Sequence, residues 1–557
     1  DAASARSFSL CSPPRSLRVS SSAPSRPVTI YMMPRTLVAA CSLLGVRARP
    51  AASRPVRSVR TRTLIAHAAP RLSDPSLWRE QAFVGGEWRE AEDGAIFEVL
   101  DPATGTTLGV CADGGAREAE AAIVAAKNAL PAWRAKTGKE RAAVLRRWFE
   151  LMMEHQRDLA LIMTMEQGKP LTESMGEISY AASFCEWFGE EAKRVSGQTL
   201  DSPTPGRRII TLKQPIGVTA AITPWNFPSA MITRKAAPAL GAGCTMVVKP
   251  SDLTPYSALA LCELAQRAGV PPGVLSVIPS SAKNAAAIGD VLCSSKDVRK
   301  LSFTGSTAVG KLLMRQCAST VKRLSLELGG NAPFLVFDDC DVDAAVAGAV
   351  AAKFRNAGQT CVCTNRLFVQ SGIREEFVQK FAESVGALKM GEGTADGVTQ
   401  GPLINEAALA KVEAHAADAI AKGAVVRVGG KRRKGKGYFF EPTVLDGCDA
   451  TMDVASQETF GPLAPVFGFE TEAEAIAAAN DTPAGLAAYV FTRDLSRAWR
   501  VSEALEYGIV GVNAGVVSNE VAPFGGFKES GLGREGSTLG MDEYLEVKSV
   551  TMAIDEA

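Results

Sequence analysis

From residue 218 onward, short apolar runs alternate with longer stretches in which apolar residues recur at helical spacing. The short runs are rich in β-branched residues, which favours strands, and they read VTAAIT (218–223), CTMVVK (244–249), LSVIPS (275–280), KLSFTG (300–305) and RLSLEL (323–328). The helical stretches between them cover residues 257–269, 282–292 and 308–319. This alternation predicts a parallel sheet with helical crossovers, the arrangement of dinucleotide-binding domains.

The segments on either side have other patterns. Residues 117–195 have helical periodicity almost throughout, and residues 196–217 are polar and turn-rich with one short β-like run. A second α/β stretch is expected from about residue 331 to 515, and a glycine-rich segment (523–537) then precedes a β-like tail. At 557 residues the chain is too long for one core, so we expect two or three domains.

Charge divides the chain at about residue 70. The whole chain has 61 basic and 60 acidic residues, but residues 1–70 hold 11 arginines and a single acid, so the remainder carries a net charge of −9. Apolar residues make up 46% of the chain and charged residues 22%, as in ordinary globular proteins. An acidic body gives no reason to expect a nucleic-acid partner.

The basic head is rich in serine, alanine, proline and arginine and almost free of acids, which is the composition of an organelle transit peptide. Its apolar run TLVAACSLLGV (36–46) is too short to span a membrane, and no other run approaches that length. The arginine-dense stretch after it favours a presequence over a secretory signal. We expect residues 1–72 to be a transit peptide or disordered leader and the protein to reach the mitochondrial matrix, with a plastid as the alternative.

The twelve cysteines are scattered, which fits free thiols in a reducing compartment, and the three histidines are isolated, so no metal is expected. Cys361 and Cys363 stand one residue apart in GQTCVCTN. A disulfide between them is awkward, because alternate residues of an extended segment point to opposite faces. Two small buried cysteines are one interpretation, but the polar neighbours favour a nucleophilic thiol.

A thiolate that attacks a carbonyl needs a donor for the developing oxyanion and a base. Without a suitable histidine, a carboxylate must be the base. Asn226 follows a predicted strand and Glu327 ends another, just before two glycines. Each also has a simpler interpretation, as a turn residue and as a solvated surface acid.

Two glycine-rich segments match nucleotide-binding patterns. GLGREG (531–536) fits G-x-G-x-x-G but follows no buried strand, so a loop is favoured. GSTAVGKL (305–312) follows a strand and opens a helix, yet Leu312 stands where a P-loop needs a hydroxyl for Mg²⁺. The pyrophosphate of a dinucleotide would suit this turn as well as ATP would, and a tight turn without a ligand is the other interpretation.

Seven motifs in order carry a resemblance: TPWNFP, KPSDLTP, FTGSTAVG, LELGGNAPF, GQTCVC, QETFGP and PFGGFKESGLGRE. Over about residues 80–550 the chain resembles the aldehyde dehydrogenase superfamily, and within it the branch that oxidises succinate semialdehyde. The resemblance implies an α/β fold with a Rossmann-type cofactor domain (73–196 and 214–328), an α/β catalytic domain (329–526) and a small β oligomerisation element (197–213 and 527–557). Homodimers or homotetramers are implied as well.

The resemblance also implies a mechanism. Cys361 would be the nucleophile, forming a thiohemiacetal and then a thioester, with the Asn226 amide and the Cys361 backbone N–H as the oxyanion hole. Glu327 would activate the water that hydrolyses the thioester. Its presence favours release of a free acid over transfer to coenzyme A.

The cofactor positions implied by the family are Trp225, Lys249, Asp252, Ser306, Glu458 and Phe460. We expect NAD, because the Asp252 carboxylate would repel a 2′-phosphate, but aspartate is short enough to leave NADP possible. The segment IPSSAKNA (278–285) departs from the family pattern on the adenine side.

The substrate positions implied by the family are Arg234, Arg355 and Ser518, which indicate an aldehyde with a distal carboxylate. For each arginine a surface ion pair is the simpler interpretation. Glutarate semialdehyde or a broad range of aldehydes is the alternative substrate. For Cys363 we consider reversible pairing with Cys361 under oxidation, or a filler role only.

Overall fold

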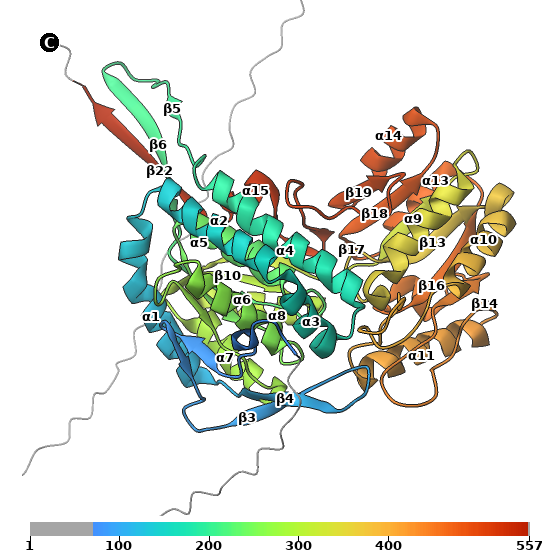
Figure 1. The fold of residues 1–557 in the computed structure, drawn as a ribbon. Helices are drawn as coiled ribbons and strands as arrows, with labels where there is room; N and C mark the ends of the chain where they lie inside the picture. The colour runs from blue at the N-terminus through green and yellow to red at the C-terminus, as the bar shows by residue number, and fades with distance from the viewer. Residues whose placement is uncertain (1–70, 555–557) are drawn as a thin grey trace, which may run out of the picture. The chain divides into compact units, whose positions relative to one another are not determined.

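In the computed structural model of the chain, residues 71–554 are described. The transit peptide is expected over residues 1–72, and its residues 1–70 therefore lie outside the described part of the chain. Two mixed sheets flanked by helices hold most of the described chain, and a small three-stranded sheet joins its tail to an earlier hairpin (Figure 1). No helix within residues 71–554 is long and apolar enough to cross a membrane.

The first sheet has eight strands in the order β2-β1-β9-β8-β7-β10-β11-β21. Its five central strands are parallel, and β1, β2 and β21 join antiparallel at the edges. The bounds are β1 (Ala82–Val84), β2 (Glu87–Arg89), β7 (Val218–Ile222), β8 (Thr245–Lys249), β9 (Leu275–Val277), β10 (Val298–Thr304), β11 (Arg323–Glu327) and β21 (Gly531–Leu532). The predicted parallel sheet is confirmed, because each predicted strand contributes to this core.

Eight helices belong to the same part of the chain: α1 (Ala116–Arg134), α2 (Gly138–Glu154), α3 (Gln156–Gln167), α4 (Leu171–Glu191), α5 (Ala230–Ala242), α6 (Pro255–Arg267), α7 (Ala282–Ser294) and α8 (Thr307–Cys317). The last three correspond to the predicted crossover helices. Helices α1, α5, α6 and α7 contact the strands directly, whereas α2, α3 and α4 form an outer layer against α5 and α6. α6 ends just before Gly269, whose φ of 92° and following prolines stop the helix. Every residue of α5 is buried, including two adjacent cations.

The second sheet has seven strands in the order β14-β15-β16-β13-β12-β18-β19. They are β12 (Ala332–Val336), β13 (Thr364–Gln370), β14 (Val425–Val428), β15 (Thr443–Asp446), β16 (Leu463–Phe469), β18 (Ala487–Phe491) and β19 (Ile509–Val512), with helices α9 (Val342–Phe354), α10 (Arg374–Gly386), α11 (Glu406–Ala421), α13 (Glu472–Asn480) and α14 (Leu495–Ala504). All neighbours except β14 and β15 are parallel. The predicted second α/β stretch is confirmed.

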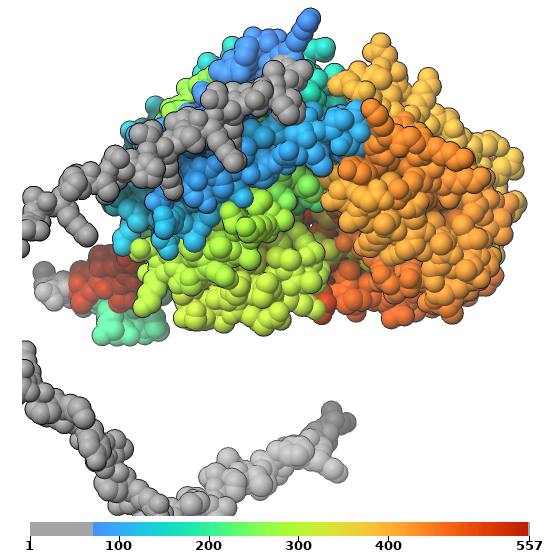
Figure 2. Space-filling view, turned by 90° about the horizontal axis from the view of Figure 1, so that it is seen from below, coloured from blue at the N-terminus to red at the C-terminus, as the bar shows by residue number. Residues whose placement is uncertain are grey.

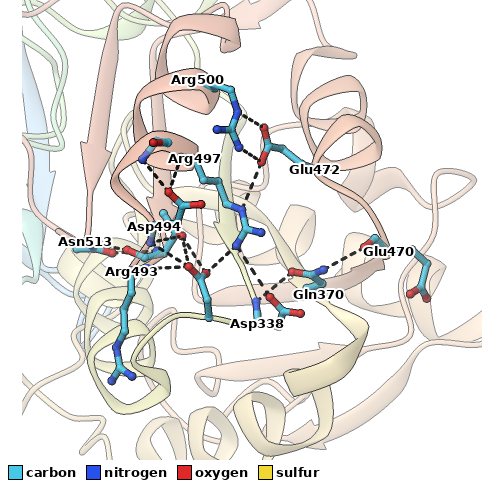
Figure 3. A network of polar contacts seen from close by, with 12 residues as sticks. Asp338, Gln370, Glu470, Glu472, Arg493, Asp494, Arg497, Arg500 and Asn513 are labelled. Atoms are coloured by element: carbon cyan, nitrogen blue, oxygen red, sulfur yellow. Dashed lines mark hydrogen bonds and ion pairs between the residues drawn. The ribbon is translucent and has the colours of Figure 1, made fainter.

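A network of charged side chains fastens α13 and α14 to this sheet (Figure 3). Arg497 bonds to Asp339 at 2.8 Å and to Glu472 at 3.3 Å, and its guanidinium lies 4.7 Å from the ring centre of Phe337. Arg500 bonds to the same Glu472 at 3.0 Å. Because both carboxylates face arginines, the network ties the two helices to the sheet.

Smaller elements complete the described chain, among them the two-stranded sheet of β17 (Ala484–Gly485) and β20 (Phe527–Lys528) and the short helices α12 (Asp453–Ser456) and α15 (Ser537–Asp542). β22 (Leu545–Ala553) runs antiparallel beside β6 (Arg207–Pro215), and β6 also pairs with the two-residue β5 (Thr199–Leu200) (Figure 1). The hairpin of β3 (Ile96–Leu100) and β4 (Thr107–Ala112) reaches the second half of the chain, as the blue and orange segments of Figure 2 show. The domain boundaries given above stay a prediction.

Candidate active site

One cavity of about 330 Å³ lies where the loops after the first sheet meet those of the second. Ligands of open α/β sheets bind beyond the carboxyl ends of the strands, and β7, β10 and β11 all point their carboxyl ends here. Nine of the predicted site residues line this cavity: Trp225, Asn226, Arg234, Ser306, Arg355, Cys361, Glu458, Phe460 and Ser518. Residues separated by up to 293 positions in the sequence are thus brought together.

The other four predicted residues do not line the cavity. Lys249 ends β8 and is buried, and burial lowers its pKa although the Asp252 carboxylate opposes this. Asp252 is half-buried beside a separate small pocket. Glu327 and Cys363 are buried behind the cavity wall.

A strained turn delivers Cys361 to the cavity. Asn356, Ala357 and Gly358 all have left-handed backbone angles, with φ of 51°, 52° and 76°. Gly358 is required here, because a Cβ at this position would lie 2.1 Å from the carbonyl oxygen of Gly461. Such strain is held only where the surroundings enforce it, and it is concentrated at functional sites.

The two neighbouring thiols have different surroundings. Cys361 is half-buried in the cavity wall, whereas Cys363 is 2% exposed, with its sulfur 3.5 Å from the carbonyl oxygen of Lys353. Both are free thiols. Residues 360–363 form a turn, with the Cys363 N–H donating to the carbonyl oxygen of Thr360 at 2.9 Å, and not the extended segment considered for the two thiols. Redox pairing of Cys363 with Cys361 stays a prediction.

Burial raises the pKa of Cys361 to about 12, an effect that Arg234 partly opposes. Burial, with a further contribution from the Glu535 carboxylate, also raises the pKa of Glu327 well above its usual range. Neither Glu327 oxygen has a hydrogen-bond partner in the described chain. The site therefore holds a largely neutral thiol and a carboxyl group whose ionised form is a stronger base than an ordinary carboxylate.

Asn226 directs its side-chain amide into this region. Its Nδ2 donates to the carbonyl oxygen of Gln359 at 3.0 Å, and no second partner of that amide is found among the described residues. One N–H is anchored and the other is available, which suits a donor to an oxyanion formed at the cavity wall.

Arg234 lies on α5 in a buried ion-pair cluster. Its Nε bonds to Glu535 at 2.6 Å, its guanidinium stacks 4.0 Å from the Phe524 ring centre, and Nη1 donates to the Tyr180 hydroxyl at 3.3 Å. Burial alone would lower the pKa of Arg234, but the Glu535 carboxylate outweighs burial and raises it. Nη2 is buried without a partner in the described chain, so this arginine can still bind an anion.

Arg355 and Ser518 also belong to the polar part of the wall. The Arg355 guanidinium lies 4.8 Å from the ring centre of Phe227, and no carboxylate of the described residues pairs with it. Neither arginine is the surface ion pair of the simpler interpretation. The Arg355 guanidinium is unpaired among the described residues, and that of Arg234 keeps one donor nitrogen without a partner. Such a cavity favours an anionic ligand.

The rim of the cavity fits a dinucleotide. Ser306 is the N-cap of α8, directly after β10, so the helix N-terminus faces the cavity. A Cβ at Gly305 would lie 2.4 Å from the Phe303 ring and would displace it, and one at Gly329 would lie in tight contact with the Glu458 carboxylate at 3.0 Å. These small residues and backbone N–H groups suit a pyrophosphate.

Glu458 and Phe460 suit the part of the cavity where the nicotinamide ribose of a dinucleotide would lie. Burial raises the pKa of Glu458 to about 7, and its carboxylate accepts from the Gly330 N–H at 3.1 Å. Phe460, at a φ of 57°, packs edge-on against Trp225 with ring centres 5.6 Å apart. Within residues 71–554, no group of three or more metal-ligating side chains is positioned to hold a metal ion.

Sequence reasoning missed several members of the site. Tyr180, Phe227 and Phe524 line the cavity, but single aromatic residues carry no signal of their own. Glu535 lies in GLGREG, whose first residues form the antiparallel edge strand β21 beside β11, so the segment does not follow a buried parallel strand as a dinucleotide-binding turn does. A signal for Glu535 did exist: two adjacent cations in the apolar segment AMITRKAAPAL require a buried carboxylate partner.

A sequence model of the Aldehyde dehydrogenase family matches residues 88–550. Succinate-semialdehyde dehydrogenase [NADP(+)] GabD of Escherichia coli (strain K12) is 61% identical over 484 residues, which cover 87% of this chain and 100% of that protein. Glutarate-semialdehyde dehydrogenase of Pseudomonas putida is 59% identical, covering 87% and 100%. The mitochondrial succinate-semialdehyde dehydrogenase of Arabidopsis thaliana is 55% identical, covering 86% and 91%. The crystal structure of succinate-semialdehyde dehydrogenase from Burkholderia pseudomallei superposes with a TM-score of 0.86 at 61% identity, covering 87% and 100%.

Proposed function

The chain belongs to the aldehyde dehydrogenase family, and we propose that it oxidises succinate semialdehyde to succinate with NAD⁺ or NADP⁺. The observation that carries the proposal is the pair of arginines in the wall that also holds Cys361. Arg355 lacks a counter-ion among the described residues, and Arg234 keeps one donor atom unbonded. A substrate carboxylate would satisfy both while its aldehyde carbon meets the thiol.

In the first stage, the Cys361 sulfur bonds to the aldehyde carbon. Burial raises the pKa of this thiol to about 12, so it must first lose its proton to solvent water, and the neighbouring Arg234 favours the thiolate. The carbonyl oxygen becomes negative in this thiohemiacetal. It accepts hydrogen bonds from the Asn226 side-chain N–H that is not bonded to Gln359 and from the Cys361 backbone N–H. Ser306, Glu458 and Phe460 would hold a nicotinamide cofactor, which would supply the acceptor for the hydride of this carbon. Loss of the hydride would leave a thioester on Cys361.

In the second stage, water hydrolyses the thioester. Glu327 takes a proton from the water as the water oxygen attacks the thioester carbon. The carbon–sulfur bond breaks, the Cys361 thiolate is regenerated, and the free acid leaves. The raised pKa of Glu327 suits it to this task, because its ionised form is a stronger base than a carboxylate of ordinary pKa.

The length of the substrate is less strictly set than its charge. One methylene is worth only about 1–3 kcal/mol of discrimination, so activity on glutarate semialdehyde is expected alongside succinate semialdehyde. A glutarate-semialdehyde dehydrogenase among the relatives favours the same second substrate.

For the cofactor we propose NAD⁺ as the preferred form and NADP⁺ as a weaker one. Asp252 lies three residues beyond Lys249, at the carboxyl end of β8, where its charge would disfavour a 2′-phosphate. The Escherichia coli relative is named for NADP(+), which supports NADP⁺ as a second cofactor.

We also propose a homodimer or homotetramer in the mitochondrial matrix. β22 is paired on one side only within the described residues, and its Val547 is 66% exposed, an edge that a second copy would cover. Several eukaryotic relatives at 53–56% identity are named as mitochondrial. Light scattering of the purified protein and import into isolated mitochondria test the two proposals.

The testing experiment uses reduced protein lacking residues 1–70 and follows formation of reduced nicotinamide. Succinate semialdehyde is compared with acetaldehyde and a long-chain aldehyde, first with NAD⁺ and then with NADP⁺. A strong preference for the semialdehyde is expected. Equal or faster turnover of the uncharged aldehydes would remove the carboxylate site from the proposal and leave a broad aldehyde-oxidising enzyme.

A further inference from the structure

A buried ion pair lies beneath the loop that carries Asn226. Lys169, in the turn after α3, and Glu177, on α4, are each 2% exposed and bond at 2.5 Å. Neither residue lines the cavity. Taking two charges out of water costs several kcal/mol per ion, so a buried pair is weak evidence of stabilisation and calls for another explanation.

The contacts of this pair converge on residues 226–230. Lys169 Nζ also donates to the backbone oxygen of Asn226 at 2.7 Å and lies 4.1 Å from the Phe227 ring centre. Glu177 accepts from the backbone N–H groups of Ser229 at 3.0 Å and Ala230 at 3.3 Å. The Ser229 side chain makes no capping bond, so Glu177 serves as the cap of α5 from another helix.

A second set of contacts holds Asn226 from the side of Cys361. Asn356 Nδ2 donates to the same backbone oxygen of Asn226 at 3.0 Å, and Gln167 donates to Asn356 Oδ1 at 3.0 Å. The Asn226 amide in turn donates to the oxygen of Gln359, two residues before Cys361. Hydrogen bonds therefore hold both the backbone and the side chain of Asn226. Its second side-chain N–H, which has no partner among the described residues, is fixed in orientation.

We propose that Lys169, held by Glu177, is a positioning residue that fixes the Asn226 amide for the oxyanion formed when Cys361 attacks a carbonyl. This rests on the oxyanion role proposed above for Asn226. Lys169 touches neither substrate nor cofactor and acts through the backbone of Asn226. Displacing a reacting group by 1 Å can cost about 100-fold in rate, so loss of this support should be measurable.

The test compares two reactions of Cys361 in the full chain. Acetylation by p-nitrophenyl acetate passes through a tetrahedral oxyanion, whereas alkylation by iodoacetamide displaces iodide at a saturated carbon and forms none. Neither reaction needs the nicotinamide or a substrate carboxylate, so the result does not depend on the proposed substrate. Labelling of the Cys361 peptide is followed by mass spectrometry.

Lys169→Met should slow acetylation by about 10- to 100-fold and change alkylation by less than about twofold. Asn226→Ala should slow acetylation by about 100- to 1,000-fold, as removal of an oxyanion donor does, and adding Lys169→Met should slow it little further. The matched control is Lys300→Met, which removes the cation of another buried ion pair, that with Glu543, and should change neither rate.

Lys169→Met leaves Glu177 buried without its cation, so Lys169→Met/Glu177→Gln is tested beside it as a neutral pair of similar size. The same selective loss is expected in both. Equal slowing of acetylation and alkylation would assign Lys169 a purely structural role and overturn the proposal. Unchanged acetylation, or losses of Lys169→Met and Asn226→Ala that multiply, would overturn it as well. Selective loss in a protein that does not oxidise succinate semialdehyde would uphold this inference and reject the proposed substrate.

Discussion

Replacing Arg355 by methionine should remove the substrate's charge recognition without disturbing the chemistry at Cys361. Arg355 is the cleaner of the two arginines to change, because it has no ion pair among the described residues. Removing Arg234 instead would leave the buried Glu535 with Lys235 as its remaining cation. Methionine keeps an unbranched apolar stem against Phe227, so the packing is largely retained.

The expected loss follows from the interaction that disappears. A hydrogen bond between a guanidinium and a carboxylate contributes about 1.5–3 kcal/mol, which corresponds to about 10- to 150-fold in kcat/KM for succinate semialdehyde. For butanal, which has the same carbon chain and no carboxylate, kcat/KM should change by less than about threefold. The assay measures reduced nicotinamide with both aldehydes.

A matched control variant is Arg433→Met. Arg433 also stacks on a phenylalanine, with its guanidinium 3.4 Å from the Phe439 ring centre, but it lies outside the cavity. Arg433→Met should leave kcat/KM unchanged for both succinate semialdehyde and butanal. Equal losses for succinate semialdehyde and butanal in Arg355→Met, or no loss for either, would refute the reasoning.

Three further predictions concern other groups. Because the pKa of Glu327 is raised and its ionised form is the base, deacetylation of Cys361 should accelerate as pH rises toward that pKa and then level off. Glu327→Gln should abolish this dependence and slow the step by about 100- to 10,000-fold, and an unchanged stopped-flow pH profile would exclude the role. Asp252→Ala should raise kcat/KM with NADP⁺ relative to NAD⁺ by about tenfold, and an unchanged ratio would remove Asp252 from the ribose. After peroxide inactivation, dithiothreitol should no longer restore the activity of Cys363→Ala. Full recovery of its activity would disprove redox pairing of Cys363 with Cys361.

The fold was largely readable from the sequence because its signals are local. Strands β7 to β11 are short apolar runs between helical stretches, and the period of apolar residues changes at each boundary. The β10-to-α8 turn was recognisable from its small residues next to a strand. The pairing of β22 with β6 joins residues more than 300 positions apart, and no local pattern specifies it.

The site was only partly readable, for two physical reasons. Cys361, Asn226 and Glu327 belong to distinctive motifs, so their types and neighbours indicated chemistry. The residues that position these three belong to no such motif. In the sequence, Lys169 resembles an ordinary surface lysine in a polar turn. Its burial arises only because α4 lies over the Asn226 loop. The left-handed turn at residues 356–358 is likewise imposed by tertiary contacts, because two of its three residues are not glycine.

The central claim is that Cys361 carries the acyl group and Glu327 releases it. The most direct measurement mixes the Glu327→Gln variant with succinate semialdehyde and NAD⁺, stops the reaction with acid, and determines the mass of the Cys361 peptide. The account predicts one succinyl group on that peptide and one equivalent of reduced nicotinamide per active site, because hydrolysis is blocked after oxidation. No adduct, or a succinyl group on any other residue, would contradict it.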